Sequence, residues 1–190
     1  DFVRVLVKKR FLDAPRDHWT TDAAENLATL GLLDEGNTTV LNPLQSVTLL
    51  ALSSSLFNSY GYDLDPQFKR MSIERQYILS AEKAGLMDGI PFVEQMNGKQ
   101  AVTWGQALVM ILNSEGLLEP LGALKNRPSS DHYSQRALDV ALDHGYLPMA
   151  VRSEINLNDP IGKAELAYRL SKTVRFEQAI ATLYDWESYL

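Results

Sequence analysis

Apolar residues in this chain gather in short stretches at helical spacing, separated by loops that contain Gly, Pro and Asn. The first stretch predicts a helix that begins at Asp22, because Glu25 stands three residues later as in a capping box. Gly31 should end this helix as a left-handed residue. The apolar face comprises Ala23, Ala24, Leu27 and Leu30.

A second helix is expected from about Thr48 to Phe57, after a loop that contains Leu41-Asn42-Pro43. This helix is apolar on nearly every side. Its apolar residues are Leu49, Leu50, Ala51, Leu52, Leu56 and Phe57. A helix of this kind is buried at the centre of a protein.

The same order of elements returns twice in weaker form. The second copy predicts helices over 73–84 and 104–114, and the third over 134–144 and 163–173. The spacing from Trp19 to Gly31 equals that from Tyr133 to Gly145, and Gly85 holds the corresponding place in the second copy. Internal repetition of this kind indicates a repeat architecture.

Two helices cannot bury both of their faces, so the copies are expected to fold together. The pattern predicts one all-α domain over residues 11–173, with three helix–loop–helix repeats in a pseudo-threefold arrangement around a central helical bundle. The repeats span about 11–60, 61–118 and 119–173. Residues 1–10 are a short strand or a lead-in. Residues 174–190 form a C-terminal helix that extends the preceding helix or packs separately.

Composition narrows the function classes. The net charge of −6 argues against a general nucleic-acid binder, which needs a basic face. The absence of cysteine excludes disulfides and thiolate metal sites. No run of apolar residues is long enough to predict a membrane span. The chain begins at Asp1 without Met, and we expect that a leader or a preceding domain has been removed.

Candidate catalytic groups are few. Asp13, His18 and Trp19 are expected to have structural or groove-lining roles. The acidic or amide-rich segments 63–65 and 156–159 are expected to cap turns, because neither has the glycine and terminal glutamate of a calcium-binding EF-hand loop. Without a phosphate-binding loop or a nucleophile motif, the sequence predicts a protein that is not an enzyme and uses no cofactor.

The repeat resembles the S-layer homology family, whose motif runs F-x-D-V-x-x-x-H-W, helix, G-I-I-x-G, F-x-P and I-T-R-A-E-F. The opening of this motif is similar to Phe11-Leu-Asp13-Ala-Pro15 together with His18-Trp19 in this chain. The end of the motif is similar to Ile161-Gly162-Lys163-Ala164-Glu165-Leu166. The resemblance covers about residues 11–173.

The resemblance implies that grooves between repeats bind a cell-wall polysaccharide. The arginine of the T-R-A-E element contacts this ligand in the family. Here the position is occupied by Leu49, Trp104 and Lys163, so that only the third copy has a cation. The ligand-binding residues implied are Asp13, Trp19, Tyr133, Lys163 and Trp104. Trp104 is either a platform for a sugar ring or a partly buried wedge.

The expected function is therefore non-catalytic anchoring of an exported protein at the bacterial cell surface. The expected partner is a cell-wall polysaccharide or a peptidoglycan-linked polymer, and other surface-layer proteins are further partners. The alternative is a scaffold for protein–protein assembly that has lost glycan binding. Loss of the cation from two of the three arginine positions favours the alternative. Retention of Asp13, Trp19, Tyr133 and Lys163 favours the first interpretation.

Overall fold

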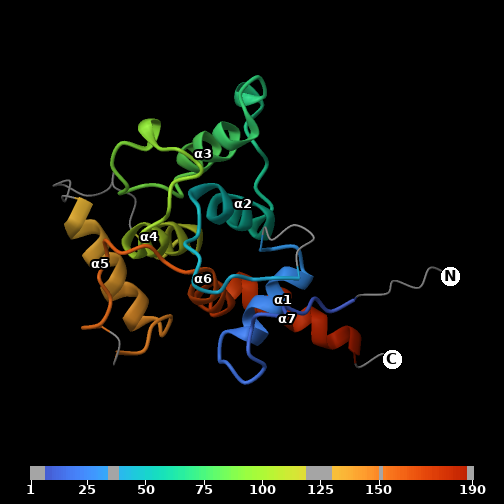
Figure 1. Cartoon of the computed structure of the whole chain (residues 1–190). Helices are drawn as coiled ribbons and strands as arrows, with labels where there is room; N and C mark the ends of the chain where they lie inside the picture. Colours follow the sequence, from blue (N-terminus) through green and yellow to red (C-terminus); the bar gives the residue numbers. More distant parts are fainter. Residues whose placement is uncertain (1–6, 34–38, 119–129, 150–151, 188–190) are drawn as a thin grey trace. The chain divides into compact units, whose positions relative to one another are not determined.

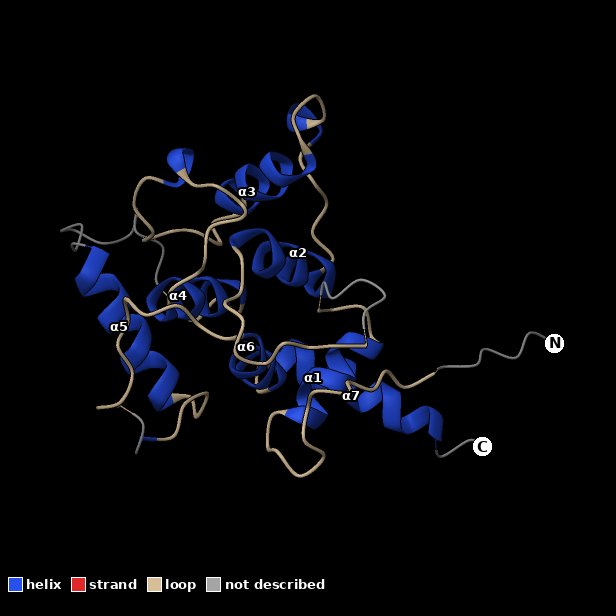
Figure 2. Ribbon diagram, viewed as in Figure 1, coloured by secondary structure: helices blue, strands red, loops and turns tan. Residues whose placement is uncertain are grey.

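A computed structural model describes residues 7–33, 39–118, 130–149 and 152–187. The described residues are helical and contain no β-sheet (Figure 2). Their only β-type pairings are two isolated bridges, Thr48–Ala101 and Thr103–Pro160. The all-α class expected from the apolar pattern is confirmed for this part of the chain. The contacts divide the chain into two compact units, which we describe separately.

Unit 1 comprises the described residues up to Gln45 and from Gly162 onward. It contains α1 (Thr21–Thr29), α6 (Lys163–Ser171) and α7 (Val174–Glu187). Helix α1 packs against both α6 and α7, so the two ends of the chain share one core (Figure 1). The fully buried residues of this core include Leu27, Leu41, Leu170 and Phe176.

Unit 2 comprises the described residues from Ser46 to Ile161. Its helices are α2 (Leu49–Tyr60), α3 (Ile73–Lys83), α4 (Trp104–Ser114) and α5 (Ser130–Asp143). Two short 3-10 helices, η1 (Pro66–Phe68) and η2 (Val93–Gln95), flank α3. Helix α2 packs against α3 and α4, and α4 packs against α5.

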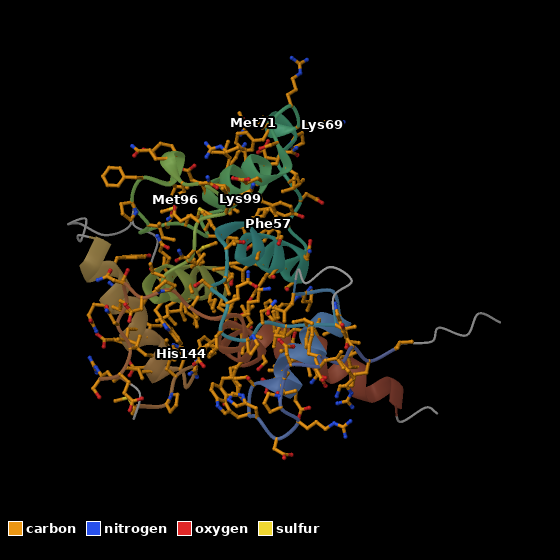
Figure 3. All side chains as sticks on the ribbon, viewed as in Figure 1. Phe57, Lys69, Met71, Met96, Lys99 and His144 are labelled. Carbon is orange, nitrogen blue, oxygen red and sulfur yellow. The ribbon has the colours of Figure 1, made fainter. Side chains whose placement is uncertain are left out.

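The apolar second helices are buried as expected. Helix α2 buries Leu52, Leu56 and Phe57, and α4 buries every residue from Ala107 to Leu112. Phe57 lies on α2 (Figure 3), and its ring contacts the rings of Tyr62 and Tyr77. Burial of these side chains is the main hydrophobic contribution to the stability of unit 2.

The packing partners of the first helices come from other copies. Within unit 2, α3 of the second copy packs on α2 of the first, and α5 of the third copy packs on α4 of the second. Within unit 1, α1 of the first copy packs on α6 of the third. The long loop between the two helices of a copy allows this exchange, whereas a tight turn would force them to pair.

The three glycines that follow the first helices have the expected conformation. Gly31, Gly85 and Gly145 have φ angles of 71°, 78° and 75°. In each case the next residue donates a backbone hydrogen bond to the carbonyl five positions earlier, as in a Schellman motif. Glycine adopts this backbone without the steric penalty of a Cβ atom.

Two predicted helix starts are corrected. Helix α1 begins at Thr21 after the N-cap residue Thr20, so the capping box at Asp22 is wrong. Glu25 is instead buried, where it accepts a hydrogen bond from the Phe11 N–H and pairs with Arg10. Helix α5 begins at Ser130 rather than at residue 134. Of the two alternatives left open for the C-terminal segment, the structure has the separate helix, because α6 ends at Ser171 and α7 begins at Val174.

Candidate functional site

Each second helix begins with the same backbone hydrogen bonds. In α2, the first two N–H groups, of Leu49 and Leu50, donate to the carbonyls of Gln100 and Gly98, both at 2.9 Å. The first N–H groups of a helix have no partner inside the helix, and these carbonyls satisfy two of them. The acceptors lie two residues apart, in the loop that precedes the second helix of the next copy.

The other two starts repeat this arrangement. In α4, Trp104 donates to the Asp159 carbonyl and Gly105 to the Leu157 carbonyl, both at 2.9 Å. In α6, the bonds run from Lys163 to Gln45 and from Ala164 to Pro43, at 2.9 and 3.1 Å. The first helical residue in each case is one of the three positions that the sequence pattern singled out.

The accepting loops also share a turn. The carbonyl of an asparagine accepts from the N–H three residues later in all three loops. The pairs are Asn42 with Gln45, Asn97 with Gln100, and Asn156 with Asp159, at 2.8, 2.9 and 3.0 Å. Three loops with different sequences therefore share one turn hydrogen bond at this point.

In the first of these loops, the carboxylate of Asp13 fixes the chain. Asp13 Oδ1 accepts from the Leu41 N–H at 2.8 Å, and Oδ2 accepts from the Asn42 N–H at 2.7 Å. Asn42 has a left-handed φ of 53°, which asparagine tolerates better than most residues. Asp13 thus holds a strained turn, a role that agrees with the structural interpretation of this residue.

The positive charge of Lys163 stabilises the ionised carboxylate of Asp13. Burial raises the pKa of Asp13, but the hydrogen bonds from Leu41 and Asn42 and the charge of Lys163 outweigh this effect, so the pKa lies below its ordinary value. The Lys163 side chain is half-buried at the first position of α6. Gly162 precedes it, and a Cβ atom there would lie 3.1 Å from the Pro43 carbonyl oxygen. The glycine therefore allows the close approach of helix and loop.

A shallow depression lies at this loop in unit 1. It is lined by Asp13, Asn42, Pro43, Leu44 and Gln45. The carboxylate, the two side-chain amides and the neighbouring cation can exchange hydrogen bonds with hydroxyl and carboxyl groups of a ligand. One of the lining residues, Leu44, is 93 % exposed. We call these five residues and Lys163 the Asp13–Lys163 site.

Trp19 contacts a different face of α6 from the one on which Lys163 lies. Its ring packs edge-on against Tyr168, with ring centroids 4.4 Å apart, and lies 5.9 Å from the guanidinium of Arg169. At 3.6 residues per turn, Tyr168 and Arg169 are rotated about the axis of α6 by about 140° and 240° from Lys163. Two of the five candidate residues, Asp13 and Lys163, therefore come together, and Trp19 lies apart from them.

The remaining two candidates lie in unit 2. Trp104 is half-buried at the first position of α4, which agrees with a partly buried wedge and leaves part of the ring accessible. Tyr133 is only 1 % exposed and packs against Gly89, where a Cβ atom would lie 1.9 Å from its ring. A ring with so little exposed surface offers no face for a sugar, and we leave Tyr133 out of the candidate site.

The position of Leu49 also bears on the ligand. Leu49 is 2 % exposed, so the first copy buries the side chain that corresponds to Lys163. An arginine introduced there would bring its charge into an apolar core, which is costly without a partner. Among the described residues, no group of three or more acidic or histidine side chains is arranged to hold a metal ion.

The segments with a faint calcium-loop pattern cap turns. Asp65 accepts from the Gln67 N–H at 2.9 Å, and Asn156 accepts from the Asn158 N–H at 3.1 Å. The pKa of Asp65 lies below its ordinary value, because its carboxylate accepts hydrogen bonds from Lys83 and Gln67. These bonds outweigh the effect of burial, which would raise the pKa. Each side chain satisfies backbone donors of its own loop, as expected from the sequence.

The sequence pattern did not indicate that Tyr168 and Arg169 contact Trp19, or that Lys172 lies over the Tyr168 ring. The spacing of Glu165 to Arg169 and of Tyr168 to Lys172 places each pair one turn apart on one helix. That signal was present, but only the tertiary contact with Trp19 shows its relevance. Helix length gives one further result: no described helix is both long and apolar enough to cross a membrane.

No known family model matches this chain, and a search of curated proteins likewise finds no match.

Proposed function

We propose that this protein is a non-catalytic module that anchors an exported protein to the bacterial cell envelope by binding a cell-wall polysaccharide. The proposal includes an arrangement of three repeats related to the S-layer homology family, with pseudo-threefold organisation. It is supported by the three equivalent helix starts, at Leu49, Trp104 and Lys163, each joined to a loop of another copy. Repeats that share backbone contacts after their side chains have diverged are expected of a duplicated ancestor.

One observation carries the choice of ligand. Lys163 is the cation at the first position of α6, beside the loop that Asp13 holds. A half-buried ammonium group near amide and carboxylate oxygens can pair with an acidic substituent of a glycan, while Asp13 and Gln45 bind its hydroxyl groups. We therefore place the ligand at the Asp13–Lys163 site in unit 1.

The test is co-sedimentation with purified cell-wall sacculi, before and after the secondary polymer is stripped. Lys163→Ala should weaken binding by about 1–3 kcal/mol, the range for loss of a hydrogen bond to a charged group. Lys163→Arg should keep or strengthen it, because arginine can pair with a carboxylate through two hydrogen bonds. The matched control is Lys99→Ala, at an exposed lysine of unit 2 (Figure 3). Unchanged binding of Lys163→Ala would exclude this site.

A second candidate function is assembly with other surface proteins. It is favoured by the exposed Leu12 and Leu44, which flank Asp13 and would suit an apolar partner. No binding of the unmodified chain to sacculi, together with binding to an isolated surface-layer protein that Leu44→Ser abolishes, would support this alternative.

A further inference from the structure

An exposed tryptophan in unit 1 is held in place from several directions. Trp19 leaves 52 % of its surface exposed, yet its ring meets that of Tyr168 edge-on at 4.4 Å. The His18 ring lies 5.6 Å away, and the Arg169 guanidinium lies 5.9 Å from the indole centroid. A tryptophan that served only the core would be more deeply buried.

The neighbours of Trp19 are themselves fixed. Arg169 is 5 % exposed and pairs with Glu165, one turn earlier on α6. The Nδ1 atom of His18 lies 2.7 Å from the Thr20 hydroxyl oxygen. The indole is therefore ordered before any ligand arrives, and binding on it costs little side-chain entropy.

A cation lies beside this aromatic pair. Lys172 Nζ lies 5.1 Å from the centre of the Tyr168 ring, and the Lys172 side chain is exposed. Lys172 forms no ion pair with any residue that the structure describes. An aromatic platform with an adjacent lysine suits a ligand that has both an apolar face and an acidic group.

The location separates this group from the Asp13–Lys163 site. Lys172 follows Lys163 by about two and a half turns of α6, so the two side chains project from opposite faces. One sugar residue cannot contact both cations across the helix. The two positions therefore act as distinct sites.

We propose that Trp19, Tyr168 and Lys172 form a second glycan-binding site, for a pyranose that carries a carboxylate. The apolar face of the sugar ring stacks on Trp19, and its carboxylate pairs with Lys172. A nucleic acid would also stack, but the acidic chain repels its phosphates. The inference rests on the proposed function for the kind of ligand, but it uses no residue of the Asp13–Lys163 site.

The experiment labels the intact chain with 5-fluorotryptophan and follows its three tryptophans by ¹⁹F NMR. Loss of one signal in Trp19→Phe assigns Trp19. The probe is a hyaluronan tetrasaccharide, which contains glucuronic acid, and the matched neutral probe is its methyl ester. The acid should shift the Trp19 signal in a saturable way. Lys172→Gln should weaken its binding by about threefold to fivefold, as for loss of an exposed ion pair, and the ester should bind the native chain equally weakly.

Controls separate this proposal from the proposed function. Lys99→Gln removes an exposed lysine of unit 2 and should leave the titration unchanged. Lys163→Ala should also leave the Trp19 shift unchanged, even where it abolishes binding to sacculi. Absence of a saturable shift at Trp19 would overturn the second site. Equal binding of acid and ester, or an unchanged affinity in Lys172→Gln, would overturn the role of Lys172.

Discussion

At the residue scale, the clearest electrostatic feature is Tyr146 in unit 2. The pKa of Tyr146 is raised to about 12, chiefly by burial and also by the negative charge of Glu115. The Tyr146 hydroxyl donates a hydrogen bond to Glu115 Oε2 at 3.4 Å, which raises the pKa further. Glu115 also accepts a hydrogen bond from Tyr60 of α2. One carboxylate thus joins two tyrosines from the first and third copies.

This shift predicts a loss of stability at alkaline pH. Below about pH 10, both the folded and the unfolded chain keep the Tyr146 proton, and its contribution to stability is complete. Between about pH 10 and 12 the unfolded chain loses the proton first, so the free energy of unfolding falls as pH rises. The melting temperature of Tyr146→Phe should decline less steeply over this range than that of the native chain. A native-like decline in Tyr146→Phe would contradict the assignment.

Two glycines with positive φ give a second prediction at this scale. Gly145, with φ of 75°, has no atom within 4 Å of an added Cβ, whereas Gly89, with φ of 94°, would place a Cβ atom 1.9 Å from Tyr133. Gly145→Ala should cost about 1–2 kcal/mol of unfolding free energy, the strain of a left-handed residue. Gly89→Ala should cost about 1–3 kcal/mol more, because Tyr133 must move. Equal losses in chemical denaturation would show that Tyr133 does not occupy this space.

At the element scale, α2 illustrates how composition determines burial. Thr48 caps the helix by accepting from the Ala51 N–H at 3.2 Å, and Gly61 ends it with φ of 67°. Between them, Leu52 and Leu56 are completely buried. The first turn has no acidic residue to offset the helix dipole, so packing accounts for most of the stability of this helix.

Leu52→Ala should therefore destabilise the protein by about 2–5 kcal/mol, as other truncations of buried leucines do. The control is Leu44→Ala, at a leucine that is 93 % exposed, which should change stability by less than about 0.5 kcal/mol. Equilibrium denaturation measures both. An unchanged midpoint for Leu52→Ala would contradict the placement of α2 in the core.

At the scale of the whole molecule, the copies do not correspond to independent folding units. The first helix of each copy packs on the second helix of another: α3 on α2 and α5 on α4 within unit 2, and α1 on α6 within unit 1. Unit 1 joins residues from both ends of the chain. A single copy therefore contains two helices, but the helices on which they mainly pack belong to other copies.

This exchange predicts the behaviour of fragments. A fragment of residues 11–60 contains α1 and α2 without α6 and α3, and should be largely unfolded by circular dichroism, since short isolated helices are marginal in water. A fragment of residues 46–161 retains the α2–α3 and α4–α5 pairs and should melt cooperatively. Cooperative melting of a monomeric 11–60 fragment would contradict the exchange.

The amino-acid sequence by itself determined the helices and the glycines that end them, because these depend on local spacing and backbone conformation. The structure contains a feature of this local kind at the start of α4, where Thr103 and Gln106 form a capping box between residues only three apart. Only the tertiary structure decided which helices pair, why Glu25 is buried, and that Trp19 faces Tyr168 while Asp13 lies near Lys163. These features depend on contacts between residues far apart in the chain, and the periodicity of one segment carries no information about the partner on which it packs.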